Sequence, residues 1–329
     1  MATQAKTMND SITSSNFEKR CNTSLHRLSH SVCVFLLCFC ATSLSKADQT
    51  TDPGTLQPKS LAKPQPSKQR DRFPIPEDVN GYKTVISPAR FERPVRFAIY
   101  QGKGSNEDGI ENVINCFSGV ANTSFAKLSG EDFRTLDLNQ YAAVIFSGGV
   151  ASAQSEGLGE SGRSRVRDYV RSGGGYVGIC AGAYLACSNF SWGLGVLNAS
   201  TVSSKWRRGQ AWVKERLNGA GAEILGDTSS PFFVRYNNGP ILKPAGREDI
   251  PEYVPIALFE TEVAENDTPA GLMVHSPAQI VAHFGQGRVF ISSPHPENTP
   301  GLVHLIPRAL SWVASGKGAA LKNGTAEQE

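Results

Sequence analysis

The sequence predicts an α/β fold, in which a central, mostly parallel sheet carries helices on both faces and is extended by extra antiparallel strands. Three observations favour this class. Strand-like and helix-like segments alternate from Val95 to Arg171, as they do in βαβ units. Residues 141–146 (YAAVIF) are continuously apolar, which is typical of a strand buried on both faces. Residues 175–184 (GYVGICAGAY) predict a short strand that turns abruptly into a helix.

The chain has 329 residues, of which 40% are hydrophobic, enough for a substantial core. Near its start, Lys19, Arg20 and Arg27 precede the apolar run 32–40 and the small-residue site 45–47. This order predicts a secretory signal peptide over residues 1–47, and hence an exported protein in the periplasm or outside the cell. The apolar run is short for a bilayer span, so a membrane anchor is the less favoured alternative.

Residues 48–93 are polar and proline-rich, and they predict a linker without regular structure. The folded domain is expected over residues 94–316, followed by a flexible tail over 317–329. Ser105 and Asp108 fit a capping box for the first helix. The first half of the domain is expected to contain, in order, strand 95–100, a helix to about residue 117, strand 123–128, strand 141–146, a polar loop, helix 163–171 and the strand that begins at 175.

The second half shows more alternation and fewer helix signals, so we expect mixed or antiparallel strands there. Residues 278–284 and 288–292 flank a Gly-Gln-Gly turn and predict a hairpin. Apolar residues at helical spacing predict a closing helix over 302–313. The remaining strands are expected within residues 210–217, 232–236 and 254–262.

Cys180 stands at the corner between the predicted strand and helix. Helix N-termini favour the thiolate, which is the reactive form of cysteine. The small residues Gly178, Ala181 and Gly182 allow the sharp bend that serine hydrolases use at their nucleophile. Cys180 is therefore a candidate nucleophile, although a buried structural cysteine is the commoner alternative.

His295 and Glu297 follow the second strand of the predicted hairpin, in the sequence Ser-Pro-His-Pro-Glu. In an extended segment, side chains two residues apart lie on the same side, so Glu297 can orient the imidazole. Pro296 keeps His295 out of helical conformations. A cysteine nucleophile needs such an oriented base, whereas an exposed turn is the alternative.

Gly148 and Gly149 end a buried strand, and their amides could form an oxyanion hole together with that of Ala181. Cys180, His295 and the glycine pair all fall at carboxyl ends of predicted strands, where α/β sheets bind ligands. The polar, aromatic segments 206–209 and 235–240 could line the same pocket or be exposed turns.

Cys116, Cys180 and Cys187 remain after removal of the signal peptide, an odd number that indicates at least one free thiol. Cys180 and Cys187 would lie about 10 Å apart along a helix, too far for a disulfide. A bridge between Cys116 and Cys187 stays open. The net charge of +3 indicates no nucleic-acid partner, and no metal-ligand spacing or phosphate loop predicts a cofactor.

Together, the Gly-Ile-Cys-Ala-Gly corner at 178–182 and the His-Pro-Glu at 295–297 resemble the class I glutamine amidotransferase superfamily. Residues 147–149 and 166–184 look most like the amidotransferase-like domain at the N-terminus of biotin-protein ligases, including bacterial stand-alone forms. This resemblance implies the flavodoxin-like amidotransferase fold over about residues 95–316 and the roles of a Cys-His-Glu triad.

Tyr184 occupies the position two residues after the second glycine of the corner, where glutamine amidotransferases usually carry a glutamine that helps to hold the substrate. We therefore do not expect glutaminase activity, and nothing in the chain predicts biotin transfer. The expected protein is a cysteine hydrolase or amidase acting on a small-molecule or peptide-like substrate, with Tyr184 in the substrate pocket. The alternative is a binding module that uses the same pocket without turnover.

Overall fold

The computed structural model describes residues 75–77, 89–226, 228, 231–317 and 321–323. The predicted signal peptide and most of the predicted linker lie outside these residues. Within the described part, no helix combines the length and apolar character needed to cross a membrane.

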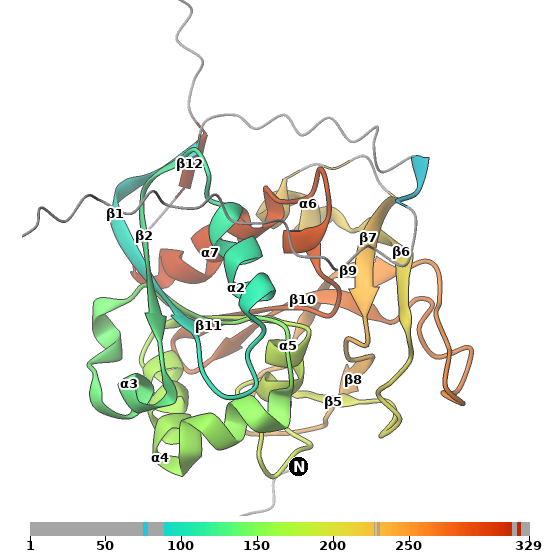
Figure 1. Cartoon of the computed structure of the whole chain (residues 1–329), viewed down its shortest axis with the longest axis horizontal. Coiled ribbons are helices and arrows are strands. Elements are labelled where there is room, and N and C mark those ends of the chain that lie inside the picture. Colours follow the sequence, from blue (N-terminus) through green and yellow to red (C-terminus); the bar gives the residue numbers. More distant parts are fainter. Residues whose placement is uncertain (1–74, 78–88, 227, 229–230, 318–320, 324–329) are drawn as a thin grey trace, which may run out of the picture. The chain divides into compact units, whose positions relative to one another are not determined.

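Five parallel strands, of which Figure 1 labels β1, β2 and β11, form one half of the main sheet. They lie in the order β2-β1-β3-β4-β11. The strands are β1 (Ala89–Tyr100), β2 (Val120–Leu128), β3 (Ala143–Phe146), β4 (Gly175–Ile179) and β11 (Gly287–Ser292). This is the flavodoxin-like order, in which the second strand lies outside the first and the chain then crosses to the other side. The predicted fold class is therefore confirmed.

Antiparallel strands extend the sheet beyond β11 in the order β10-β9-β6-β7. Their bounds are Pro277–Phe284 for β10, Val254–Phe259 for β9, Gln210–Leu217 for β6 and Phe232–Asn237 for β7. The predicted hairpin is confirmed as β10 and β11. A separate pair joins β5 (Ala199–Thr201) to β8 (Leu242–Pro244).

The two ends of the folded domain differ from the sequence expectation. Strand β1 begins at Ala89, inside the predicted linker, rather than at Val95. Residues 321–323, inside the predicted tail, form β12 (Leu321–Asn323), which pairs antiparallel with the first residues of β1.

Helices cover both faces of the sheet, and the alternation along β1 shows how. Phe97 and Ile99 belong to one apolar core, whereas Ala98 and Tyr100 belong to the other. The first core packs under α2 (Glu107–Asn115), α6 (Gly219–Leu225) and α7 (Leu305–Ala314). The second packs under α3 (Gly130–Thr135), α4 (Ala151–Arg171) and α5 (Ala181–Ala186).

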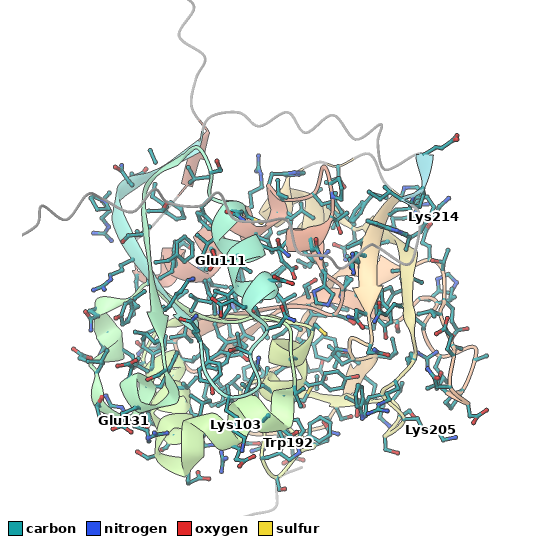
Figure 2. All side chains as sticks on the ribbon, viewed as in Figure 1. Lys103, Glu111, Glu131, Trp192, Lys205 and Lys214 are labelled. Carbon is teal, nitrogen blue, oxygen red and sulfur yellow. The ribbon has the colours of Figure 1, made fainter. Side chains whose placement is uncertain are left out.

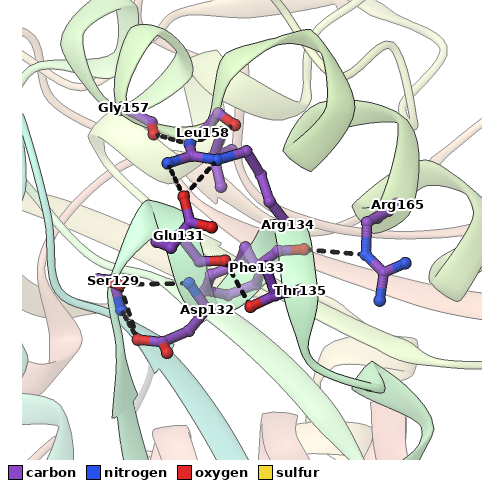
Figure 3. Close-up of polar contacts among 9 residues, drawn as sticks. All are labelled: Ser129, Glu131, Asp132, Phe133, Arg134, Thr135, Gly157, Leu158 and Arg165. Atoms are coloured by element: carbon purple, nitrogen blue, oxygen red, sulfur yellow. Dashed lines mark hydrogen bonds and ion pairs between the residues drawn. The ribbon is translucent and has the colours of Figure 1, made fainter.

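Helix α4 begins at Ala151, so the predicted polar loop before residue 163 is wrong. The helix kinks at Gly159, whose φ of 66° interrupts the helical hydrogen bonds. Arg134 of α3 donates to the carbonyl oxygens of Gly157 and Leu158, at 2.9 and 3.0 Å, just before the kink (Figure 3). A side chain from a neighbouring helix thus replaces the hydrogen bonds that the kink removes.

The N-cap of α2 is Asn106, whose side chain accepts from the amide of Gly109 at 2.9 Å. The predicted capping box of Ser105 and Asp108 is therefore wrong: the cap lies one residue later, and Gly109 at the third helical position has no side chain to complete a box. Ser105 instead closes the turn before the helix, where its amide donates to the Gly102 carbonyl at 3.0 Å.

Candidate active site

The corner at Cys180 joins β4 to α5 through a strained backbone. Cys180 has φ 52° and ψ −97°, a conformation that side-chain-bearing residues rarely adopt. A Cβ at Gly182 would lie 2.0 Å from the Phe146 carbonyl oxygen, and one at Gly178 would lie 2.6 Å from the Gly182 oxygen. Both flanking positions therefore require glycine, as the sequence predicted for a sharp bend.

The Cys180 side chain is buried in the lining of a pocket. The residue is only 8% exposed, and its thiol donates to the main-chain oxygen of Asn237 at 3.4 Å. Asn237 ends β7, a strand of the antiparallel half of the sheet. The site therefore combines the parallel and antiparallel halves.

His295 and Glu297 form a hydrogen-bonded pair, with 2.7 Å between Nδ1 and Oε1. The main chain fixes His295 from both sides, because its amide donates to the Arg235 oxygen at 2.8 Å and its carbonyl accepts from Thr299 Oγ1 at 2.8 Å. Residues 296–298 form a 3-10 turn. The two side chains thus meet across a turn, whereas the sequence argument placed them on one side of an extended segment.

The electrostatics of this pair favour the imidazolium. Burial alone would lower the pKa of His295, but the Glu297 carboxylate and the Cys180 sulfur together raise it to about 10. The side chains of His295 and Glu297 are 13% and 1% exposed, so water screens their interaction little. Among the described residues, Nε2 of His295 and Oε2 of Glu297 have no hydrogen-bond partner.

The Gly148-Gly149 turn lies directly against the histidine. A Cβ at Gly148 would be 3.1 Å from Cε1 of His295. Gly149 pairs with Ser105 in an isolated antiparallel bridge, whose two flanking hydrogen bonds use the amides of Asn106 and Val150. The Gly149 amide takes no part in that bridge.

Ala181 is the first residue of α5, so its amide has no acceptor inside the helix. Tyr184, one turn later, donates its hydroxyl to the Asn238 oxygen at 3.1 Å. Burial, followed by the nearby Tyr236 and Cys180, raises the pKa of Tyr184, so the phenol stays neutral.

A pocket of about 690 Å³ brings all of the predicted site residues together. They are Gly148, Gly149, Cys180, Ala181, Tyr184, His295 and Glu297. The segments 206–209 and 235–240 contribute Trp206, Arg235, Asn237 and Asn238, so both reach the pocket. This volume suits a small organic ligand.

Sequence reasoning missed two walls of this pocket (Figure 2 labels one residue of each, Glu111 and Trp192). A polar wall comes from α2 and its N-cap, and an apolar wall comes from the segment after α5. The missed residues include Asn106, Asp108, Glu111 and Asn112 in the polar wall, and Phe190 and Trp192 in the apolar one. In the sequence, only Asn106 as a helix cap and the aromatic residues at 190 and 192 could have indicated these two walls.

Cys116 and Cys187 are free and lie in the two different cores, on opposite faces of the sheet. The bridge between them that the sequence left open is therefore absent. Burial raises the pKa of both thiols, that of Cys187 to about 12. Both are poor candidates for thiolate chemistry.

The N-terminal half of the domain is similar in sequence to a known protein family. Residues 95–206 match the family model described as "Biotin-protein ligase, N terminal". A curated relative, an uncharacterized protein of Chlamydia muridarum (strain MoPn / Nigg), is 31% identical over 172 residues. That alignment covers 48% of this chain and 61% of the relative, so the chain spans less than two thirds of the relative's length.

Solved structures show a weaker likeness. A ThuA-like protein from Bacteroides uniformis ATCC 8492 has a TM-score of 0.47 and 14% identity, over 68% of this chain and 92% of that one. PurLQS from Thermotoga maritima has a TM-score of 0.45 and 16% identity, over 67% of this chain and 99% of that one. Both scores are below 0.5, so the strand order described above, and not these likenesses, carries the fold assignment.

The family match includes the glycine turn at 148–149 and the Cys180 corner, whereas His295 and Glu297 lie beyond it. The resemblance predicted from the sequence motifs is therefore confirmed for residues 95–206: this segment matches the biotin-protein ligase N-terminal family.

Proposed function

We propose that this protein is an exported cysteine hydrolase that cleaves an amide or ester with Cys180 as nucleophile, His295 as proton carrier and Glu297 as the residue that orients His295. The observation that carries the proposal is the 2.7 Å bond between His295 and Glu297, in the same pocket as the strained Cys180 corner.

The reaction would begin from a Cys180 thiolate beside a His295 imidazolium. The sulfur attacks the substrate carbonyl carbon and forms a tetrahedral intermediate. When the intermediate collapses, the carbon–nitrogen or carbon–oxygen bond breaks and His295 gives its Nε2 proton to the leaving amine or alcohol. Neutral His295 then takes a proton from water, the hydroxide attacks the thioester carbonyl, and the carbon–sulfur bond breaks. A carboxylic acid leaves and the thiolate–imidazolium pair is restored.

Two main-chain amides are suited to stabilise the oxyanion. The Ala181 amide starts α5, and the Gly149 amide takes no part in the bridge to Ser105. Both residues line the pocket around Cys180. Donors fixed in this way need no reorganisation when negative charge develops on the carbonyl oxygen.

Tyr184 argues for a substrate other than glutamine. Its phenol is bonded to Asn238, so the position two residues after the second glycine offers a ring and not a flexible amide. We propose a small-molecule or peptide-like amide or ester as substrate and no transfer of ammonia.

Thiol alkylation with mass-spectrometric site mapping tests the proposal. We expect iodoacetamide to label Cys180 at least about tenfold faster than Cys116 and Cys187 at pH 6, since a thiolate and not a thiol is the nucleophile. His295→Ala should remove most of this advantage. Equal labelling of all three cysteines, unaffected by that substitution, would refute the hydrolase and favour the binding module.

Export is tested separately by N-terminal sequencing of the mature protein, purified from a bacterial host. We expect a mature start close to Asp48, immediately after the small-residue site at 45–47. A chain that keeps its first residues and stays with the cytoplasmic fraction would overturn this part of the proposal.

A further inference from the structure

We infer that the substrate of this pocket carries an aromatic or other apolar group, which packs against a wall of aromatic side chains beside Cys180. The inference rests on the proposed function, because it assigns a substrate class to the same site. This aromatic wall consists of Tyr184, Phe190, Trp192 and Trp206.

Three rings of the aromatic wall contact one another in sequence, starting from the helix that begins after Cys180. Tyr184 lies one helical turn after Cys180 in α5. Its ring centroid is 6.3 Å from that of Phe190, which in turn stacks on Trp192 at 4.4 Å and 15°. All three rings are only partly buried and all line the pocket, so a group attached to the reacting carbonyl would meet aromatic surface.

The loop that carries Trp206 is hydrogen-bonded to the segment that contacts Cys180 and Tyr184. The Gly209 amide donates to Asn238 Oδ1 at 2.8 Å, and the Asn238 amide donates to the Gly209 oxygen at 3.0 Å. Asn238 also accepts the Tyr184 hydroxyl, and its neighbour Asn237 accepts the Cys180 thiol. The loop that carries Trp206 is therefore held in place before any substrate binds, as a substrate subsite requires.

The exposed hydrophobic side chains at the pocket also support an apolar group on the substrate. Five large hydrophobic side chains are exposed in the described part of the chain, and two of them, Val150 at 57% and Trp206 at 49%, line this pocket. Single exposed apolar residues need no explanation, but two at one pocket mouth, beside three further aromatic rings, indicate a binding surface. The wall formed by α2 and its N-cap is polar, so we expect the substrate to have an apolar part and a polar part.

Two alkylating reagents that differ only on nitrogen test the inference on the full chain. N-benzyliodoacetamide carries an aromatic group, and an iodoacetamide with a hydroxylated chain of similar size serves as the polar match. In each case the sulfur displaces iodide, and N-acetylcysteine provides the intrinsic rate ratio. We expect Cys180 to prefer the benzyl reagent by about tenfold over that ratio, the scale that burial of one apolar group provides.

Matched variants locate the preference. Trp206→Ala and Val150→Ala should each reduce it about threefold or more, and Trp206→Phe should retain most of it. Val254→Ala is the control, since Val254 is 50% exposed but lies outside the pocket. This control should keep the full preference. Thermal unfolding of each variant verifies that the fold is intact.

A binding measurement separates this inference from the proposed hydrolase. In Cys180→Ala, which cannot react, N-benzylacetamide should still bind, and its polar match should not, by ligand-observed NMR. A slow Cys180 with retained benzyl binding would refute the hydrolase and leave the subsite standing. Equal rates for the two reagents together with no benzyl binding, or a preference that Trp206→Ala leaves unchanged, would overturn the subsite.

Discussion

The Cys180 thiol donates a hydrogen bond to the main-chain oxygen of Asn237, with 3.4 Å between sulfur and oxygen. A thiol is a weak donor, so breaking this bond costs only about 0.5 kcal/mol. In the proposed reaction this proton has already passed to His295, so the hydrogen bond to Asn237 belongs to the enzyme before the thiolate–imidazolium pair forms. This hydrogen bond therefore orients the sulfur in the pocket but is readily broken.

Glu297→Gln should destabilise the fold in a pH-dependent way. Glu297 helps to raise the pKa of His295 from 6.5 to about 10, so its stabilising effect is complete below about pH 6.5 and is lost as the pH rises through 10. The variant lacks the largest contribution that raises the histidine pKa, so this pKa falls. We expect a loss of about 3 kcal/mol near pH 6, measured by urea unfolding, that shrinks towards pH 10.

Asp249→Asn is the control for this series, because Asp249 and its partner Arg247 are exposed and neither lines the pocket. It should change stability little at any pH. A Glu297→Gln loss that is the same at pH 6 and pH 10 would show that Glu297 acts by packing alone.

Gly148→Ala should disturb the histidine and leave the fold intact. The new Cβ would lie 3.1 Å from Cε1 and 3.9 Å from Nδ1 of His295, so the ring must shift by a few tenths of an ångström. Misplacement of a reacting group on this scale should slow Cys180 alkylation about tenfold. Gly219→Ala, with no atom within 4 Å of its Cβ, should keep the wild-type rate.

Arg134→Ala should loosen the first half of α4. The carbonyls of Gly157 and Leu158 would lose the donor that replaces their helical partners, at a cost of about 2 kcal/mol. Hydrogen exchange should quicken over residues 151–162. Arg167→Ala, which removes a pair with the exposed Glu160 of the same helix, should cost much less, because water screens exposed ion pairs. Equal effects of the two substitutions would contradict the role of Arg134 at the kink.

Glu215→Gln should make stability less dependent on pH. Burial raises the pKa of Glu215 from 4.5 to about 8, although the hydrogen bond from Gln279 opposes the shift. The folded state therefore holds a proton that the unfolded state releases, and stability falls as the pH rises from about 4.5 to 8. As the pH rises across this window, the free energy of unfolding of the variant should increase relative to that of the wild type, as measured by denaturant titration. The exposed Glu223→Gln on α6 should leave the slope unchanged.

The parts of the site that depend on local sequence were predictable. The Cys180 corner was visible because Gly178 and Gly182, two residues to either side, occupy positions that admit no Cβ, and a glycine at both positions indicates a sharp bend. His295 and Glu297 are two residues apart, so their contact required no knowledge of the rest of the fold. The parallel half of the sheet followed from apolar runs separated by helices.

The parts that depend on tertiary contacts were not predictable. The first turns of α4 are rich in serine and glycine, and they are helical because Arg134 and the second core support them. Strand β12 exists through pairing with β1, more than 200 residues earlier in the sequence. The aromatic wall joins residues from α5, the following loop and a third segment, a coincidence that no single stretch of sequence displays.

The backbone at Cys180 has a consequence for selection on this protein. At φ 52° and ψ −97°, glycine would be the most relaxed residue, and a side chain there sacrifices about 1 kcal/mol or more of folding stability. Selection for stability alone would drive this position towards glycine, as at 178 and 182 on either side. The backbone conformation at position 180 thus favours glycine over cysteine. A related chain that no longer needed the thiol would gain stability by replacing this cysteine with glycine.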